Sequence, residues 1–174
     1  PIPIPRAIRE WSGSFPATPS DPRKLREAVA DAAARLRTAK RPVLIGGIEA
    51  YRDGAEREFA RLAERLGVAV VTTPDAKGLF PMDHRQHMGI HMGPFSPPAI
   101  EKRVADADLV LAMGTVLTDM NLGAARPQVR RERAVWAVDG RVNVSFHTYT
   151  EVGLRDFLAV LVKEPLPPCR ERVA

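Results

Sequence analysis

Short apolar runs alternate along the chain with longer segments in which apolar residues recur every three or four positions. Four of the runs have the length and composition of buried strands: 42–45, 68–72, 109–113 and 134–138. A further, shorter run at 142–144 indicates one more strand. Helical spacing marks the segments 22–38, 51 or 53 to 66, 96–105 and 154–161. Alternating strands and helices are typical of an α/β domain with a largely parallel sheet.

The run LVLAM at 109–113 is the strongest strand signal, because it is apolar without interruption, as a strand buried on both faces requires. The strand, helix and strand within 42–72 form a βαβ unit, whose crossover is right-handed. We therefore predict a three-layer Rossmann-like domain with a mostly parallel sheet of about five or six strands and helices on both faces. The segment 73–98 has no period, and such a long irregular connection is usually a functional or interface loop.

Length and proline content set the expected domain boundaries. With 174 residues the chain has the size of one domain. Six prolines in the first 22 positions indicate extended chain, so we expect 1–21 to be an interdomain linker and 22–162 to be the folded domain. The proline-rich, charged segment 163–174 is expected to be a second linker or tail. Because the sequence starts PIPIPR without an initiating Met, we expect it to be cut from a longer protein.

Composition argues against several classes of protein. The net charge of +5 comes from arginines interleaved with acidic residues along helical segments, and only 6% of residues are aromatic, so we expect no nucleic-acid partner. No apolar run approaches the roughly 18 residues that a membrane helix needs, so we expect no membrane partner. Cys169 is the only cysteine, which excludes an internal disulfide and favours a cytoplasmic location.

Glycines and carboxylates follow the predicted strands, at the edge where α/β sheets bind their ligands. Gly46 and Gly47 follow the first strand but lack the GxGxxG spacing, so they indicate a phosphate contact or a tight turn equally well. After the strand 109–113 comes a polar loop with Gly114, Thr115 and Asp119, whose carboxylate could bind a ribose hydroxyl or cap its own turn. Asp139 ends the strand 134–138. The candidate site residues are therefore Gly46, Gly47, Gly114, Thr115, Asp119 and Asp139.

No catalytic or metal-binding residues are predicted. His84, His87 and His91 would share one face of a helix, but the prolines and glycines around them argue against a regular helix, and HExxH is absent. Structural or interface roles fit these histidines better. Neither a Ser/His/Asp nor a Cys/His arrangement can be composed from the sequence, so it lacks a self-contained active site.

Three stretches resemble a known family: TTPDAKGLFPMDHRQHMGIHMG, SPPAIEKRVADADLVLAMGTVLTDMNLG and AVWAVDGRVNVSFHTY. Their KGLFP motif, DLVLAMG strand and TDMN loop resemble the central domain of thiamine-diphosphate-dependent enzymes, especially the pyruvate and indolepyruvate decarboxylase group. The resemblance extends in order over roughly 22–162. It implies three successive α/β domains, of which the amino-terminal one carries a catalytic glutamate and the carboxy-terminal one a GDG…N signature that holds diphosphate through Mg. Neither of these features can be found here.

The resemblance also bears on cofactors and partners. It implies that the isolated domain binds no cofactor, that thiamine diphosphate and Mg belong to the parent enzyme, and that the partners are the parent's two outer domains and further copies in a homo-oligomer. Acetolactate synthases and pyruvate oxidases bind FAD in this domain, and FAD would lie here at the Gly46–Gly47 turn, the loop 114–119 and Asp139. The GIHMGPFSPP and VDGRV segments differ from those FAD-binding relatives and favour the decarboxylase side.

The leading hypothesis is a non-catalytic central domain that scaffolds the outer domains of a 2-oxo acid decarboxylase or carboligase. The first alternative is an FAD- or NAD-binding module, either of an acetolactate-synthase-like enzyme or self-standing, which predicts saturable nucleotide binding weakened by Asp119→Ala. The second is a structural or regulatory domain with an empty crevice. In that case Asp119→Ala would change only stability.

Overall fold

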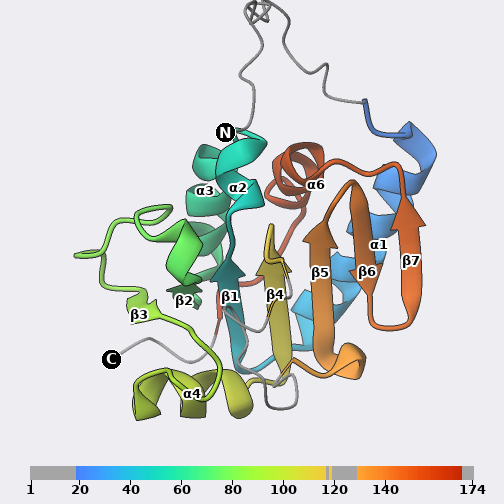
Figure 1. Cartoon of the computed structure of the whole chain (residues 1–174). Helices are drawn as coiled ribbons and strands as arrows, with labels where there is room; N and C mark the ends of the chain where they lie inside the picture. Colours follow the sequence, from blue (N-terminus) through green and yellow to red (C-terminus); the bar gives the residue numbers. More distant parts are fainter. Residues whose placement is uncertain (1–18, 117, 119–128, 170–174) are drawn as a thin grey trace, which may run out of the picture.

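The computed structural model of the chain describes residues 19–116, 118 and 129–169. Within these residues seven strands form one sheet, in the order β3-β2-β1-β4-β5-β6-β7 (Figure 1). Their bounds are β1 Pro42–Gly46, β2 Ala69–Thr72, β3 His87–Ile90, β4 Leu109–Met113, β5 Ala134–Val138, β6 Arg141–Val144 and β7 His147–Thr150. Strands β1 to β5 are mutually parallel, and β6 and β7 follow as an antiparallel hairpin. The predicted α/β fold class is confirmed.

The prediction of five or six strands was wrong, because the described residues form seven. β3 lies inside the segment 73–98, which was expected to be irregular throughout. It lacks an apolar run, and its Gly89 has a φ of +125° beside a register shift against β2. β7 is a largely exposed edge strand with the polar sequence HTYT. Both strands depend on pairing with a neighbour, which apolar patterning along the chain does not report.

The helices are α1 Pro22–Thr38, α2 Glu49–Arg52, α3 Glu56–Leu66, α4 Pro98–Ala105 and α6 Leu154–Leu161, with short 3₁₀ turns at η1 Pro74–Ala76 and η2 Arg131–Arg133. The predicted helix up to residue 66 is in fact two helices. Gly54, with a φ of +60°, interrupts the helical backbone between them. No helix in the described part of the chain is both long and apolar enough to cross a membrane.

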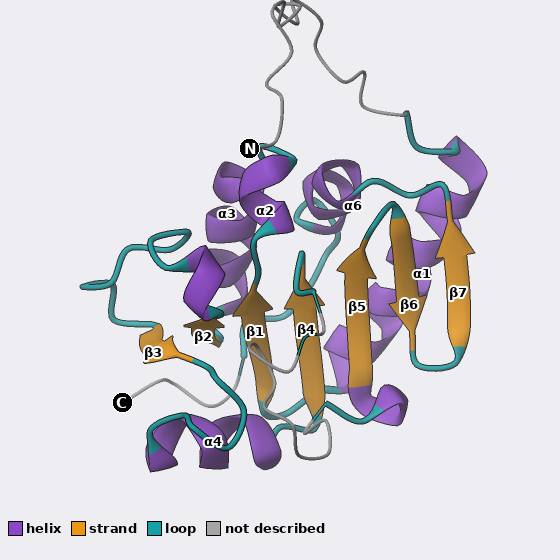
Figure 2. Cartoon of the chain, viewed as in Figure 1, coloured by secondary structure: helices purple, strands orange, loops and turns teal. Residues whose placement is uncertain are grey.

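Two apolar clusters cover the two faces of the sheet. Figure 2 shows the helices that contribute to them in purple and the strands of the sheet in orange. On one face α1, α3 and α6 pack on alternate residues of the strands, including Leu44, Leu111 and Val135. On the other face, Ile100 and Val104 of α4 pack on the intervening residues of β1, β2 and β4. Because successive strand residues point to opposite faces, the continuous apolar run of β4 contributes to both clusters. This arrangement is the predicted three-layer order.

Candidate functional site

The carboxyl ends of β1 and β4 form the point at which the strand order reverses. The chain places β2 and then β3 on one side of β1, and returns with β4 and β5 on the other side. Open α/β sheets bind ligands at such a switch point. The turn at Gly46 and Gly47 leaves β1 here, and the turn at Gly114 and Thr115 leaves β4 beside it. The structure thus brings these four candidate residues together, whereas Asp119 lies outside the described residues.

At this point the two turns are in direct contact. The N–H of Gly47 donates to the carbonyl of Met113 at 2.9 Å, and the carbonyl of Gly114 accepts from the N–H of Glu49 at 3.1 Å. The N–H of Gly114 donates to Ala137 at 2.8 Å. Since each glycine amide already donates within the protein, a phosphate could use either one only by displacing a backbone carbonyl.

Close backbone approach explains why glycine stands at both turns. A Cβ atom on Gly47 would lie 2.6 Å from the carbonyl carbon of Gly114, and closer still to that carbonyl's oxygen. Gly114 has a φ of +68°, and a Cβ there would lie 2.5 Å from the backbone nitrogen of Ala50. These geometries favour the tight-turn interpretation of the glycine pair.

Asp139 lies at the turn between β5 and β6, with a φ of +52°. Its N–H donates to the Glu49 carboxylate at 2.8 Å, and its own carboxylate forms an ion pair with Arg141 at 2.7 Å. The Asp139 side chain is 74% exposed, so this ion pair adds little to stability. Sequence reasoning missed Glu49, which joins α2 to the end of β5. An acidic residue in a first helical turn was a weak signal for it.

Beside Asp139 lies a cavity of about 360 Å³. Its lining includes Trp136, Asn143, Arg131 and Arg141. The indole N–H of Trp136 donates to the carbonyl of Thr115 at 2.8 Å, which ties the β4 turn to β5. Trp136 and Arg131 could contact a planar, anionic ligand here, whereas the charge of Arg141 is already paired with the Asp139 carboxylate, which also lines the cavity. Sequence reasoning missed this feature because the residues are brought together only by strand pairing.

The three histidines of 73–98 occupy different environments. His84 contacts Phe80 edge-on, with 4.7 Å between the ring centroids, and His87 Nε2 lies 3.3 Å from Thr72 Oγ1. His91 is fully buried. Burial lowers the pKa values of His87 and His91 below the ordinary histidine value. In the described part of the chain, no three His, Cys, Asp or Glu side chains gather as a metal site would require.

Taken together, fold and site define an α/β domain of Rossmann-like topology whose switch-point turns pack on each other. Residues 29–152 match the family model described as thiamine pyrophosphate enzyme, central domain. The chain therefore belongs to this family of thiamine pyrophosphate enzyme central domains, which confirms the resemblance found in the sequence.

The curated relatives include decarboxylases from bacteria, plants and fungi. The chain is 32% identical to indole-3-pyruvate decarboxylase of Azospirillum brasilense over 156 residues, which is 90% of this chain and 28% of the relative. It is 34% identical to pyruvate decarboxylase 1 of Nicotiana tabacum, over 79% of this chain and 33% of the relative. It is 42% identical to pyruvate decarboxylase of Neurospora crassa over 94 residues, which is 53% of this chain and 16% of the relative. The chain thus spans at most about a third of these relatives.

The family implies thiamine diphosphate and Mg in the full enzymes. Binding Mg with a diphosphate takes converging oxygen ligands, mostly carboxylates. The described residues do not fit this group, because they contain no such cluster of acidic side chains. The glycine turns do not fit a dinucleotide diphosphate well either, since the Gly47 and Gly114 amides donate to the protein.

Proposed function

We propose that this chain is the non-catalytic central domain of a thiamine-diphosphate-dependent 2-oxo acid decarboxylase or carboligase, and that it holds the enzyme's outer domains at a fixed spacing. The family match and the decarboxylase relatives support the enzyme class. The observation that carries the scaffold role is a pair of clamps, one at each end of the folded domain. The proposal includes those outer domains as partners, homo-oligomerisation and a cytoplasmic location.

The first clamp fixes the chain where it enters α1. The N–H of Asp21 donates to the carbonyl of Glu151 at 2.8 Å, and Ser20 Oγ donates to Asp156 Oδ2 at 2.6 Å. Ser20 Oγ also accepts from the N–H of Gly153 at 2.9 Å. Glu151 follows β7, which runs in the same direction as β5, so this clamp lies at the carboxyl edge of the sheet (Figure 1).

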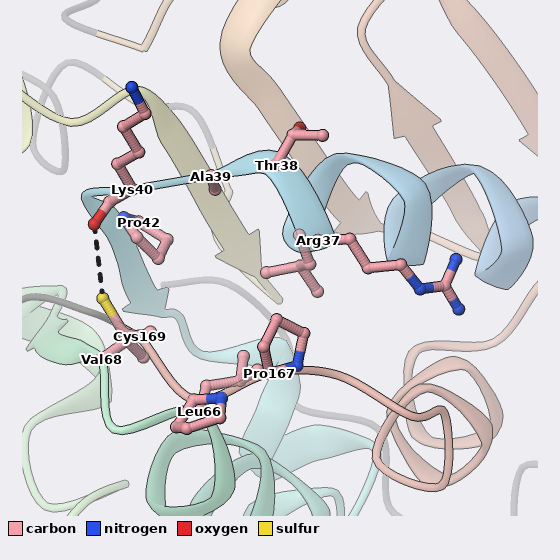
Figure 3. A pocket seen from close by; sticks show the side chains of 11 residues that line it. Arg37, Thr38, Ala39, Lys40, Pro42, Leu66, Val68, Pro167 and Cys169 are labelled. Carbon is pink, nitrogen blue, oxygen red and sulfur yellow. Dashed lines mark hydrogen bonds between the residues drawn. The ribbon is translucent and has the colours of Figure 1, made fainter.

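The second clamp fixes the strap, defined as residues 162–169, which follows α6. Arg65 donates to the carbonyls of Val162 and Glu164, and Leu166 is buried against the α1/α3/α6 face. The N–H of Cys169 donates to the carbonyl of Leu66 at 2.6 Å, and its thiol faces the carbonyl of Lys40 at 3.6 Å (Figure 3).

Leu66 and Lys40 precede β2 and β1, so the second clamp lies at the amino edge of the sheet. The described chain is therefore fastened at opposite edges of the sheet. Segments attached at the two clamps would be separated by the length of the strands, which supports a spacer role.

The labelling rate of Cys169, the only cysteine in the sequence, measures how often the second clamp opens. We expect Arg65→Ala to increase the labelling rate of Cys169 by a thiol reagent about fivefold, if the exposed Arg65 bonds contribute about 1 kcal/mol to closing the strap. Arg61→Ala changes an exposed arginine of the same helix and should leave the rate unchanged. Equal rates in the native protein and Arg65→Ala would show that Arg65 does not hold the strap, and would remove the main support for the scaffold role.

A titration separates the leading proposal from the nucleotide alternative, which the cavity beside Asp139 favours. We expect calorimetry of the 174-residue chain to detect no binding of thiamine diphosphate with Mg²⁺, and no decarboxylation of pyruvate or indole-3-pyruvate. Saturable binding of thiamine diphosphate, or turnover, would contradict the proposal. Saturable FAD or NAD binding that is weakened by Asp119→Ala or Asp139→Ala, but not by Asp83→Ala in an exposed loop, would establish the alternative.

A further inference from the structure

His91 is a buried, titratable side chain directly after β3, and within the described residues its ring makes one hydrogen bond. Its backbone N–H donates to the carbonyl of Thr72 at 2.8 Å, which anchors the residue to β2. Its Nδ1 lies 3.1 Å from Ser96 Oγ, and the ring is fully buried. Its Nε2 has no hydrogen-bond partner within the described part of the chain. A buried polar atom without a hydrogen-bond partner destabilises the folded protein, so the position of this nitrogen needs an explanation.

The same serine closes the turn that follows. Ser96 Oγ accepts from the N–H of Met92 at 2.8 Å, and the N–H of Ser96 donates to the carbonyl of Gly93 at 3.1 Å. The turn 92–96 is thus tied to the core through Ser96 and His91. Phe95 stands on it with 77% of its surface exposed, and α4 begins directly after it. The His91–Ser96 pair therefore links the turn, which carries the exposed Phe95 ring and precedes α4, to the buried end of β3.

From these contacts we propose that His91 and Ser96 form a proton-operated latch, which holds the turn 92–96 closed at neutral pH and releases it in mild acid. Protonated histidine has two N–H donors, and here Nε2–H would meet no described acceptor in a site without water access. Protonation is thus disfavoured while the latch is closed and becomes favourable once the ring reaches solvent.

The groups around His91 determine whether its pKa in the closed state lies above or below the ordinary histidine value. Burial lowers the pKa of His91, and the negative charge of Glu101 on α4 acts in the opposite direction. From β2 the contact is the uncharged Thr72 backbone, and from the turn it is the uncharged Ser96. Because the closed state binds the proton more weakly than the open state, the open population grows as the pH falls below the ordinary histidine pKa of about 6.5. It grows about tenfold per pH unit until the lowered pKa of the closed state is reached.

Hydrogen exchange of the Met92 amide, measured by NMR and corrected for the intrinsic rate, tests the latch. Between pH 7.5 and 5.5 we expect its protection to fall by up to about tenfold in the native chain, the limit set by one group with an ordinary histidine pKa in the open state. In His91→Gln the protection should not depend on pH, and in Ser96→Ala it should be low at both values. His147→Gln, which removes a ring 74% exposed on β7, and His87→Gln on β3 should both behave like the native chain.

Protection that is independent of pH in the native chain would overturn the latch. So would a fall in protection that persists in His91→Gln or disappears in His87→Gln. If His91→Gln does not fold, side-chain NMR of the native protein gives the midpoint of His91 titration directly. The proposal requires this midpoint to lie below the ordinary histidine pKa and at a lower pH than the onset of Met92 exchange, so a His91 that titrates at about pH 6.5 or above would equally refute it.

Discussion

Replacing Gly47 with alanine is expected to destabilise the domain by about 3 kcal/mol or more, a large part of the total stability of a domain this size. The new Cβ would lie 2.6 Å from the carbonyl carbon of Gly114. Its neighbours are backbone atoms of the turn after β4, which cannot rotate away as a side chain would. The two switch-point turns would have to separate, and the hydrogen bond from Gly47 to Met113 would be lost.

Gly153→Ala is the matched control for this prediction. Gly153 has ordinary backbone angles, φ −70° and ψ 141°, and its added Cβ would lie 3.5 Å from Ser20 Oγ, which is normal contact. We expect Gly153→Ala to change the free energy of unfolding by less than about 1 kcal/mol. Urea unfolding of both variants provides the measurement. If Gly47→Ala were as stable as Gly153→Ala, the close packing of the turns would not be a structural requirement.

Replacing Gln86 with leucine is expected to lower the free energy of unfolding by about 2–3 kcal/mol. Gln86 is 3% exposed, and its side-chain amide donates to the carbonyls of Ala63 and Val68, both at 2.7 Å. These bonds hold the end of the loop before β3 against α3 and the start of β2. Leucine fills a similar volume but donates no hydrogen bond, so the carbonyls of Ala63 and Val68 both lose this donor, and Ala63 keeps only its bond from the N–H of Gly67.

Two further variants separate hydrogen bonding from packing at Gln86. Gln86→Glu keeps the shape but points acceptor oxygens at two carbonyls, so at pH 7 it should destabilise at least as strongly as leucine. Arg85→Leu alters the exposed neighbour and should stay within about 0.5 kcal/mol of the native value. A Gln86→Glu variant with native stability in urea unfolding would contradict the assigned bonds.

The elements that could be predicted are those whose signal lies in their own residues. The strands 109–113 and 134–138 have the bounds that their apolar runs predict, as do the helices 22–38 and 154–161 from their spacing. β3 could not be predicted, because its place depends on pairing with β2 and on Gly89 at a φ of +125°. β7 is stabilised by pairing with β6 rather than by apolar residues of its own.

The candidate site likewise has features that the sequence could predict and features that it could not. Parallel strands bring their carboxyl ends to one edge, so the approach of the two glycine turns followed from the strand order expected of the fold. The role of Glu49 could not be foreseen, because its carboxylate accepts from Asp139, 90 residues further along the chain. The cavity at Trp136 likewise depends on the pairing of β5 with β6. Whether the predicted residues bind a cofactor stays a prediction, to be tested by the titration.

The proposed position of this domain, between two others in a thiamine enzyme, is tested by the DNA sequence of the gene on both sides of this segment. We expect one continuous reading frame, with a glutamate-bearing α/β domain before Pro1 and a GDG signature followed by an asparagine after Ala174. A start codon just before Pro1 together with a stop codon soon after Ala174 would contradict it, and nucleotide binding by a self-standing domain would become the better account.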